Sequence, residues 1–269
     1  PQRHYLDVDQ HYNFFNPKGG LSWDLNNHHA FASVAMSNRE PERNNFTDNG
    51  NSDPFPKPEQ LIDYEIGYDY NGVNWQVGTN LYYMDYNNQF VQTGELSDIG
   101  ESLTTNIKKS YRMGIELQAG INVTPWLTIE GNAALSQNKL NDFDEVVEDW
   151  DNGEAVIHYE NTTLAFSPST ILNGFVTFHH KGFEATWHSN YVSRMYLDNT
   201  ENLDRSLPGY STSNISLGYT LAMNNVLKEA IFKVNFNNLF NKRYAASGWV
   251  YSAICESGGH PNDNRYYQI

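Results

Sequence analysis

Acidic side chains are concentrated between residues 141 and 154, in the stretch NDFDEVVEDWDNGE. Carboxylate oxygens at this density are ligands that Ca²⁺ prefers, and Asp149 and Asp151 stand two residues apart, as in a calcium loop. The rest of the EF-hand spacing is missing, because no bidentate Glu follows at its twelfth position. We therefore interpret the run as a solvated acidic loop and predict no specific metal ion. Trp150, inside the run, is a candidate contact for a small-molecule ligand.

The nine histidines are further candidate metal ligands. Two adjacent pairs stand beside predicted short turns, where imidazole nitrogens could bind a metal ion. We favour the simpler interpretation that they are polar residues at turn ends. These pairs are His28-His29 and His179-His180. Four more lie off the predicted strands or near their ends, and the spacing leaves haem ligation by one of them open: His4, His11, His158 and His260.

No catalytic constellation stands out in the sequence. There is no evident Ser/His/Asp set, glycine-rich phosphate loop or CxxC pair. Paired carboxylates occur only as repeats along strand faces, so a hydrolase would lack a site. The single cysteine, Cys255, cannot form a disulfide within the chain. The sequence therefore predicts neither an enzyme nor a bound cofactor.

The composition argues against one class of partner. The chain has 17 Lys and Arg against 32 Asp and Glu, a net charge of −15, and shows no basic stripe that could bind nucleic acid. Mean hydropathy is −0.63, and no apolar run is long enough for a transmembrane helix. Aromatic residues are abundant, with 18 Tyr, 14 Phe and 6 Trp. They suit both the girdles of a membrane barrel and the strands of a soluble β protein.

Alternating apolar and polar residues predict long strands. Residues 111–123, for example, place apolar side chains at odd positions and polar ones at even positions. Such segments exceed the usual soluble strand of about five or six residues and are long enough to cross a bilayer at a tilt. We predict about eleven strands by this criterion. They lie near residues 19–25, 30–37, 60–70, 74–86, 109–123, 126–138, 169–179, 183–193, 210–221, 230–238 and 265–269.

Charged residues occupy the polar faces of these strands. These charges could contact a ligand across a lumen, or they could simply be solvated by water. The pattern leaves both interpretations open. The candidates are Asp63, Glu65, Arg112, Glu116 and Glu130.

Connections between the predicted strands alternate in length. The short ones are residues 26–29, 71–74, 124–125, 181–182 and 223–229. The long polar ones are residues 38–59, 87–108, 139–166, 194–208 and 241–264. This asymmetry is typical of an all-β, antiparallel up-and-down barrel that crosses a membrane, with tight turns at one end and long loops at the other. A soluble sandwich that binds glycans stays open as an alternative, since its polar face would also meet water.

Four segments of the chain resemble the barrel of TonB-dependent outer-membrane receptors. They are residues 15–22 (FNPKGGLS), 38–41 (NREP), 58–68 (PEQLIDYEIGY) and 238–244 (NLFNKRY). The last resembles a segment near the C-terminal end of family members, and all four follow the family's order, so the resemblance covers nearly the whole chain. Arg39 and Glu40, in the second segment, are candidate ligand contacts in a long loop.

The resemblance implies a 22-stranded barrel with an N-terminal plug domain in its lumen. On this comparison residues 1–269 are a partial barrel domain, its C-terminal part without the final strand, and the plug is not present. The strand pattern that breaks off at residues 265–269 agrees with a chain that continues further. The lack of a signal peptide at the start agrees with numbering that begins inside the mature polypeptide.

The same resemblance implies import of a scarce nutrient such as an iron-siderophore, haem or cobalamin. Long extracellular loops would close over the ligand, and the TonB complex of the inner membrane would supply energy for its release inward. The expected partners are this complex, the small-molecule ligand, and the lipid and lipopolysaccharide of the cell outer membrane. Two alternatives stay open: a passive porin-like channel, and an outer-membrane barrel enzyme such as a lipase or protease.

Overall fold

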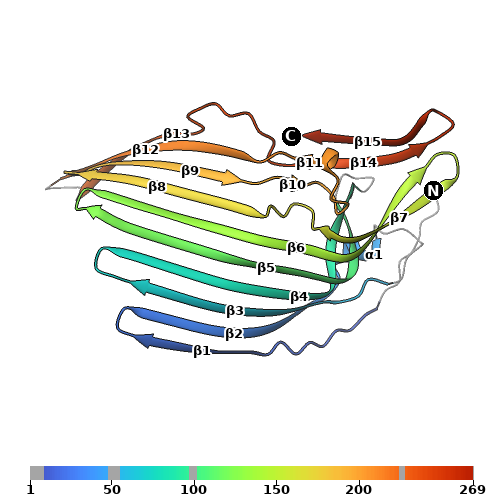
Figure 1. Ribbon diagram of the computed structural model, residues 1–269, viewed down its shortest axis with the longest axis horizontal. Helices are drawn as coiled ribbons and strands as arrows, with labels where there is room; N and C mark the ends of the chain where they lie inside the picture. The colour runs from blue at the N-terminus through green and yellow to red at the C-terminus, as the bar shows by residue number, and fades with distance from the viewer. Residues whose placement is uncertain (1–8, 48–54, 97–101, 224–227, 269) are drawn as a thin grey trace.

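The chain folds into one large antiparallel sheet (Figure 1). The computed structural model describes residues 9–47, 55–96, 102–223 and 228–268. The strands of the main path follow chain order and are hydrogen-bonded as β1-β2-β3-β4-β5-β6-β8-β9-β12-β13. Their bounds are β1 Lys18–Leu25, β2 His28–Arg39, β3 Glu59–Asn71, β4 Trp75–Leu96, β5 Ser102–Thr124, β6 Leu127–Asp149, β8 Thr170–His180, β9 Phe183–Val192, β12 Tyr210–Ala222 and β13 Glu229–Phe236.

Additional strands lie at the long-loop end of the sheet. β7 (Gly153–Thr163) forms a hairpin with the second half of β6. β14 (Gly248–Cys255) pairs with β15 (His260–Gln268) and meets the end of β6 in a short parallel contact. β10 (Met195–Tyr196) and β11 (Ser206–Leu207) form a separate two-stranded sheet. The described helices, α1 (Arg43–Thr47) and the 3₁₀ helix η2 (Leu203–Arg205), are short, and no described helix could span a bilayer.

Within the described residues, every strand predicted from the alternation is present, but four predicted loops are wrong in part. Residues 194–208 contain the short strands β10 and β11. Residues 87–108 mostly continue β4 and β5, residues 139–166 contain the end of β6 and all of β7, and residues 241–264 contain β14 and the start of β15. These strands extend beyond the region in which one face is apolar, so the alternation that marks a strand fades. The predicted loop 38–59 contains α1, and its residues 48–54 lie outside the described residues.

One face of the sheet, here called the outer face, is apolar and exposed. Leu81 on β4 lies opposite Ile66 on β3 and Ile115 on β5 in the strand register, and Leu135 on β6 continues the row. Ile66 is 61% exposed and Leu81 51% exposed. Each apolar Å² left in water costs about 25 cal/mol, so a continuous face of this kind requires an apolar neighbour. The hydrocarbon of a membrane is such a neighbour.

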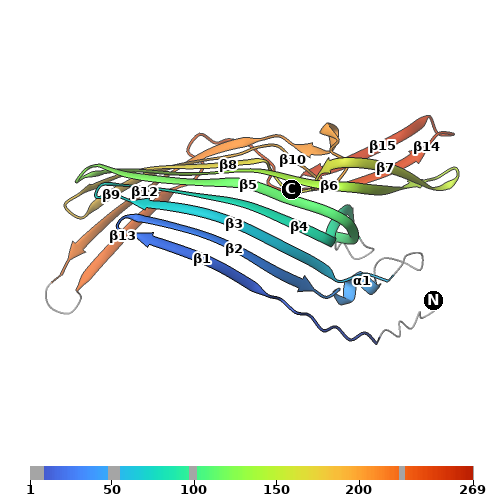
Figure 2. The same cartoon turned by 60° about the horizontal axis from the view of Figure 1, so that its bottom comes forward.

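The two ends of the sheet differ. Tight turns gather at one end, and α1, β7, β10 and β14 lie at the other; Figure 2 shows the curvature of the sheet between them. Aromatic pairs mark two levels of the outer face: Tyr70 and Trp75 near the turns, with ring centroids 4.5 Å apart, and Tyr83 and Tyr111 nearer the loops, at 6.0 Å. Trp75 and Tyr83 both lie on β4, about 27 Å apart along the strand at ~3.4 Å per residue.

Buried apolar side chains lie at the long-loop end, where additional segments cover the sheet. One cluster joins the ends of β4, β5 and β6: Val91, Ile107, Leu140, Phe143 and Leu164. A second joins the segment before β12 to β14: Leu197, Leu207 and Val250. The compact core of the described chain is therefore at this end.

Candidate ligand-binding face and loop end

The face opposite the outer face, here called the inner face, is polar. On β5, Arg112 lies opposite Met84 of β4 and Asn138 of β6 in the register. The polar row continues across the sheet, since Asn173 of β8 donates a hydrogen bond of 2.9 Å to Asn132 of β6. These positions alternate with those of the outer face because successive side chains of a strand point to opposite sides. The inner face is thus a wall of hydrogen-bonding groups.

Arg112 occupies the most distinctive position on this wall. Its guanidinium lies 5.8 Å from the centroid of the Tyr86 ring. Within the described residues, Arg112 Nε, Asp63 Oδ1 and Asn80 Oδ1 are buried without a hydrogen-bond partner. Buried polar atoms ordinarily have partners. Asp63 lies at the level of Arg112 in the strand register, and Asn80 lies further along, opposite Glu116. The inner face therefore holds one donor and two acceptors that lack partners among the described residues, at two levels.

The predicted inner-face residues share one face but do not form a compact cluster. Glu116 is four residues from Arg112 on β5, or about 14 Å along the strand. Glu130 on β6 lies opposite Gly120, a further four residues along β5. Glu116 and Glu130 are exposed, whereas Arg112 is half-buried. The structure confirms a shared face for these candidates and leaves their role as a prediction.

Arg39 is already engaged by neighbouring strands. It lies opposite Glu59 where β2 and β3 begin to separate, and its Nη2 is 3.8 Å from Glu59 Oε2. The guanidinium is 5.2 Å from the centroid of the Phe90 ring, and the same Glu59 oxygen accepts a 2.7 Å hydrogen bond from the Phe90 amide. Glu40, just beyond β2, is exposed. Of the two loop candidates, Glu40 is the one more open to a ligand.

Trp150 lies at the tip of the β6–β7 hairpin. Its side chain is 58% exposed, while its amide donates a 2.9 Å hydrogen bond to the carbonyl of Ile254. Asp151 accepts a 2.9 Å hydrogen bond from the Ser257 amide. The hydroxyl of Ser257 also donates to this carboxylate, and that bond is the main reason that the pKa of Asp151 is lowered. The tip is therefore fastened to the β14–β15 hairpin and presents an indole to solvent.

The acidic run is a strand end and a turn, so the prediction of a loop is wrong, while most of its described carboxylates are exposed to solvent as predicted. Asp149 Oδ1 accepts hydrogen bonds from the amides of Asp151 and Asn152, at 2.9 and 3.1 Å. The side-chain amide of Asn152 donates to Asp149 as well, and this bond does most to lower the Asp149 pKa. These carboxylates cap a turn, because they satisfy its backbone donors.

A segment that the sequence predicts as a capture loop is instead firmly anchored. Residues 194–208, here called the strap, carry Arg205, whose side chain is 3% exposed. Its guanidinium pairs with Asp198 at 2.9 Å and with Glu145 of β6. Asn199 is fully buried, accepts a 2.9 Å hydrogen bond from the Ala165 amide and donates a 2.6 Å bond to a carbonyl oxygen of β4. Sequence reasoning missed the strap because its partners lie 60 and 107 residues away.

Glu201 adds a second anchor to the strap. It accepts a 2.9 Å hydrogen bond from Lys139 Nζ of β6 and a 2.7 Å bond from the Thr163 amide of β7. Burial opposes the charged form, but these hydrogen bonds outweigh it, so the Glu201 pKa is lowered. The strap is thus held to the β6–β7 hairpin by charge at two places.

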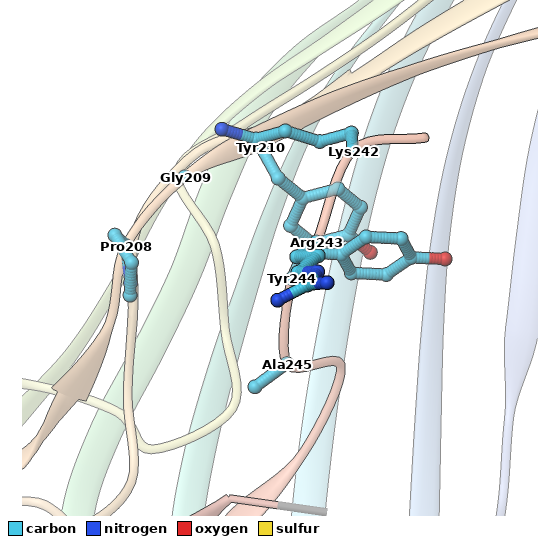
Figure 3. Close-up of a pocket in the computed structure, with 7 residues that line it drawn as sticks. All are labelled: Pro208, Gly209, Tyr210, Lys242, Arg243, Tyr244 and Ala245. Atoms are coloured by element: carbon cyan, nitrogen blue, oxygen red, sulfur yellow. The ribbon is translucent and has the colours of Figure 1, made fainter. Parts of the chain in front are cut away.

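A pocket of about 450 Å³ lies between the start of β12 and the segment after β13 (Figure 3). Tyr210 and Tyr244 stack there with ring centroids 4.1 Å apart, beside the exposed side chains of Lys242 and Arg243. Asn238 shapes this segment, because its side-chain oxygen accepts a 2.8 Å hydrogen bond from the Lys242 amide. The NLFNKRY segment therefore forms a hydrogen-bonded turn with an aromatic and cationic surface.

Comparison with known protein families agrees with a sheet that has one apolar and one polar face and two different ends. Residues 3–239 match the family model described as TonB-dependent receptor-like, β-barrel. The chain belongs to the TonB-dependent receptor family. Members of this family are transport receptors of the outer membrane. No curated protein matches the chain.

Solved structures of transporters and receptors have a fold similar to that of this chain. The copper transporter OprC has 18% identity and a TM-score of 0.63 over 83% of this chain and 33% of its own. The ferric-catecholate import receptor Fiu from E. coli K12 has 20% identity and a TM-score of 0.60, covering 93% of this chain and 34% of its own. The siderophore receptor PiuA from Acinetobacter baumannii has 17% identity and a TM-score of 0.63, with the same two coverages of 93% and 34%. This receptor chain therefore spans about a third of the length of each.

Proposed function

We propose that the chain is part of the barrel of an outer-membrane receptor that imports a scarce nutrient with energy from the TonB complex. The observation that carries the proposal is the sheet itself, with an exposed apolar outer face and a hydrogen-bonding inner face in one register. Lipid would cover the first face, and the second would line a wet lumen. In this proposal residues 1–269 are a barrel segment, and other residues of the receptor supply the plug.

The proposed ligand is an iron-siderophore, haem, cobalamin or a comparable small molecule. Support comes from the family, and from structural neighbours named as ferric-catecholate and siderophore receptors. The inner face would contribute through Arg112, whose buried Nε lacks a partner among the described residues. At the loop end, the exposed indole of Trp150 and the exposed carboxylate of Glu40 are the candidates that a ligand reaches first.

The anchored strap restricts which segments take part in capture. Residues 194–208 are held by buried ion pairs, so the proposal assigns them to the rigid frame of the receptor. The tip of the β6–β7 hairpin is fastened to β14–β15 as well, so the proposal assigns Trp150 to a fixed contact surface for the ligand. This differs from the expectation that all long connections close over the ligand.

Uptake by cells that lack the gene tests the proposal. A panel of ferric siderophores, haem and cobalamin is supplied to wild-type and deletion cells, and a second deletion removes TonB. We expect uptake of one ligand class to be lost in both deletions. Uptake that depends on the gene but not on TonB would favour the passive porin-like channel, and unchanged uptake of every ligand would contradict both.

A further inference from the structure

Four chelating side chains lie together on one side of the β6–β7 hairpin. In the register, Asp142 lies opposite Glu160, and Asp144 lies opposite His158. Residues two apart on a strand point to the same side, so the two cross-strand pairs form a two-by-two array. The array is exposed, with the side chains of His158 and Asp142 at 53% and 63%. The array brings Asp142 and Asp144, from the acidic run, next to His158, for which the sequence predicts no specific partner.

The hydrogen bond between His158 and Asp144 orients the imidazole. Nδ1 of His158 lies 2.6 Å from Asp144 Oδ1. An ionised carboxylate is only an acceptor, so Nδ1 must be the donor, and in the neutral ring the lone pair then resides on Nε2. Nε2 lies 4.0 Å from Asp142 Oδ1 and 3.7 Å from Glu160 Oε1. A carboxylate that orients a metal-binding histidine through its other nitrogen is a common arrangement around zinc.

The geometry points to a binding site for a first-row divalent cation of the Zn²⁺ type, with His158 Nε2, Asp142 and Glu160 as ligands and Asp144 as the positioning residue. The three ligand atoms lie within 4.8 Å of one another. Bonds of about 2.0–2.2 Å around a tetrahedral ion require separations of roughly 3.3 Å. Rotation of these exposed side chains supplies that adjustment, and a water molecule completes the coordination.

Charge and donor type favour this class of cation. Among the described residues, His158 is the only basic side chain within ion-pair distance of Asp142, Asp144 and Glu160. Three carboxylates on one small surface repel one another, and a bound divalent cation would offset that repulsion. An imidazole among carboxylates suits Zn²⁺ and its neighbours, whereas Ca²⁺ and Mg²⁺ prefer oxygen ligands alone. The inference rests on this hairpin and not on the proposed transport.

Titration of the purified full-length receptor with ZnCl₂ tests the site directly. The experiment uses isothermal calorimetry in a detergent that does not chelate metals, with Ca²⁺ and Mg²⁺ in excess. We compare wild type with H158Q, E160Q and D144N, and use H179Q as the matched control, since His179 is an exposed histidine at the opposite end of the sheet. We expect Zn²⁺ affinity to fall by at least about tenfold in H158Q and E160Q and to be unchanged in H179Q.

D144N separates positioning from ligation. It should weaken Zn²⁺ binding while leaving the absorption of bound Co²⁺ like that of wild type, because the ligand set is unchanged. Equal affinity in wild type and H158Q, or no binding tighter than about 1 mM, would overturn the site. Thermal unfolding of each variant shows that it is folded. Because the readout is binding, the uptake experiment can fail while this one succeeds, and the reverse.

Discussion

Arg205 and Asp198 form an ion pair of 2.9 Å with side chains only 3% and 4% exposed. Glu145 of β6 pairs with the same guanidinium. The strap is therefore tied to the β6–β7 hairpin by charges that are shielded from water. Loss of one partner leaves another charge buried and uncompensated, which is more damaging than replacement of the whole group by apolar side chains.

Substitution of Arg205 should release the strap. We expect R205M to lower stability by about 3–5 kcal/mol, because Glu145 and Asp198 remain buried without their cation. The measurement is thermal unfolding of the full receptor in detergent, together with protease cleavage within residues 194–208. R243M is the control, since Arg243 is exposed. The triple variant E145Q/D198N/R205M should recover part of the loss, and equal damage by R243M would refute the role of the buried group.

Acid should loosen the second anchor of the strap. Hydrogen bonds from Lys139 and Thr163 outweigh the effect of burial and lower the pKa of Glu201 below its ordinary value of 4.5. A lowered folded-state pKa contributes stability that is present above the unfolded value and is lost as pH falls through the folded value. We therefore expect E201Q to melt below wild type near neutral pH, with the difference shrinking in acid. A difference between E201Q and wild type that is constant down to about pH 3 would contradict this.

Alkaline pH acts through Tyr159 on β7. Burial, then the charge of Glu145 and the hydrogen bond to it, raise the pKa of this phenol to about 12. Because the pKa is raised, the protonated phenol of Tyr159 contributes to the free energy of unfolding. This contribution is complete below about pH 10 and is lost as pH rises through the folded-state pKa. Y159F should lack this part of the alkaline destabilisation. A difference absorbance titration of wild type against Y159F measures the phenol, and ionisation near its ordinary value would disprove the shift.

A tight turn offers a sharp test of backbone geometry. Gly182, between β8 and β9, has φ of +83°, and a Cβ built there would lie 2.6 Å from the Thr220 carbonyl oxygen of β12. G182A should therefore cost about 1–3 kcal/mol through backbone strain and displacement of β12. Gly174 on β8 has no atom within 4 Å of such a Cβ, so G174A is the matched control and should be nearly neutral. Similar melting temperatures for the two variants would argue against this turn geometry.

The inner face gives a prediction for transport. If a ligand contacts Arg112, R112Q should raise the ligand concentration for half-maximal uptake by roughly tenfold, the effect of losing one charged hydrogen bond. E130Q should have a much smaller effect, because Glu130 lies eight residues further along the register of β5. Surface expression is measured in parallel by antibody labelling. If the uptake curve is unchanged in R112Q, Arg112 does not contact the ligand and is one of the solvated charges of the inner face.

Strands in which one face is apolar over a long stretch could be predicted from the sequence. Strands without such a face could not. In β5, alternation of Ile115 and Leu117 with Arg112 and Glu116 reveals both the strand and its faces. In β7 the alternation is short: Ile157 and Tyr159 lie on one side, and Val156 interrupts the polar side formed by His158 and Glu160. The buried group around Arg205 could not be predicted either, since Glu145 lies 60 residues away. Contacts of that separation depend on the path of the whole sheet.

The two aromatic levels of the outer face also define a preferred membrane. Trp75 and Tyr83 are about 27 Å apart along β4, which a strand tilt of about 40° reduces to roughly 21 Å along the bilayer normal. This height suits a thin hydrocarbon layer, and the bacterial outer membrane is thinner than average. In lipids with longer acyl chains, the receptor would have to compress the surrounding bilayer or draw polar residues into it. Acyl-chain length in reconstituted vesicles thus becomes a variable that controls its stability.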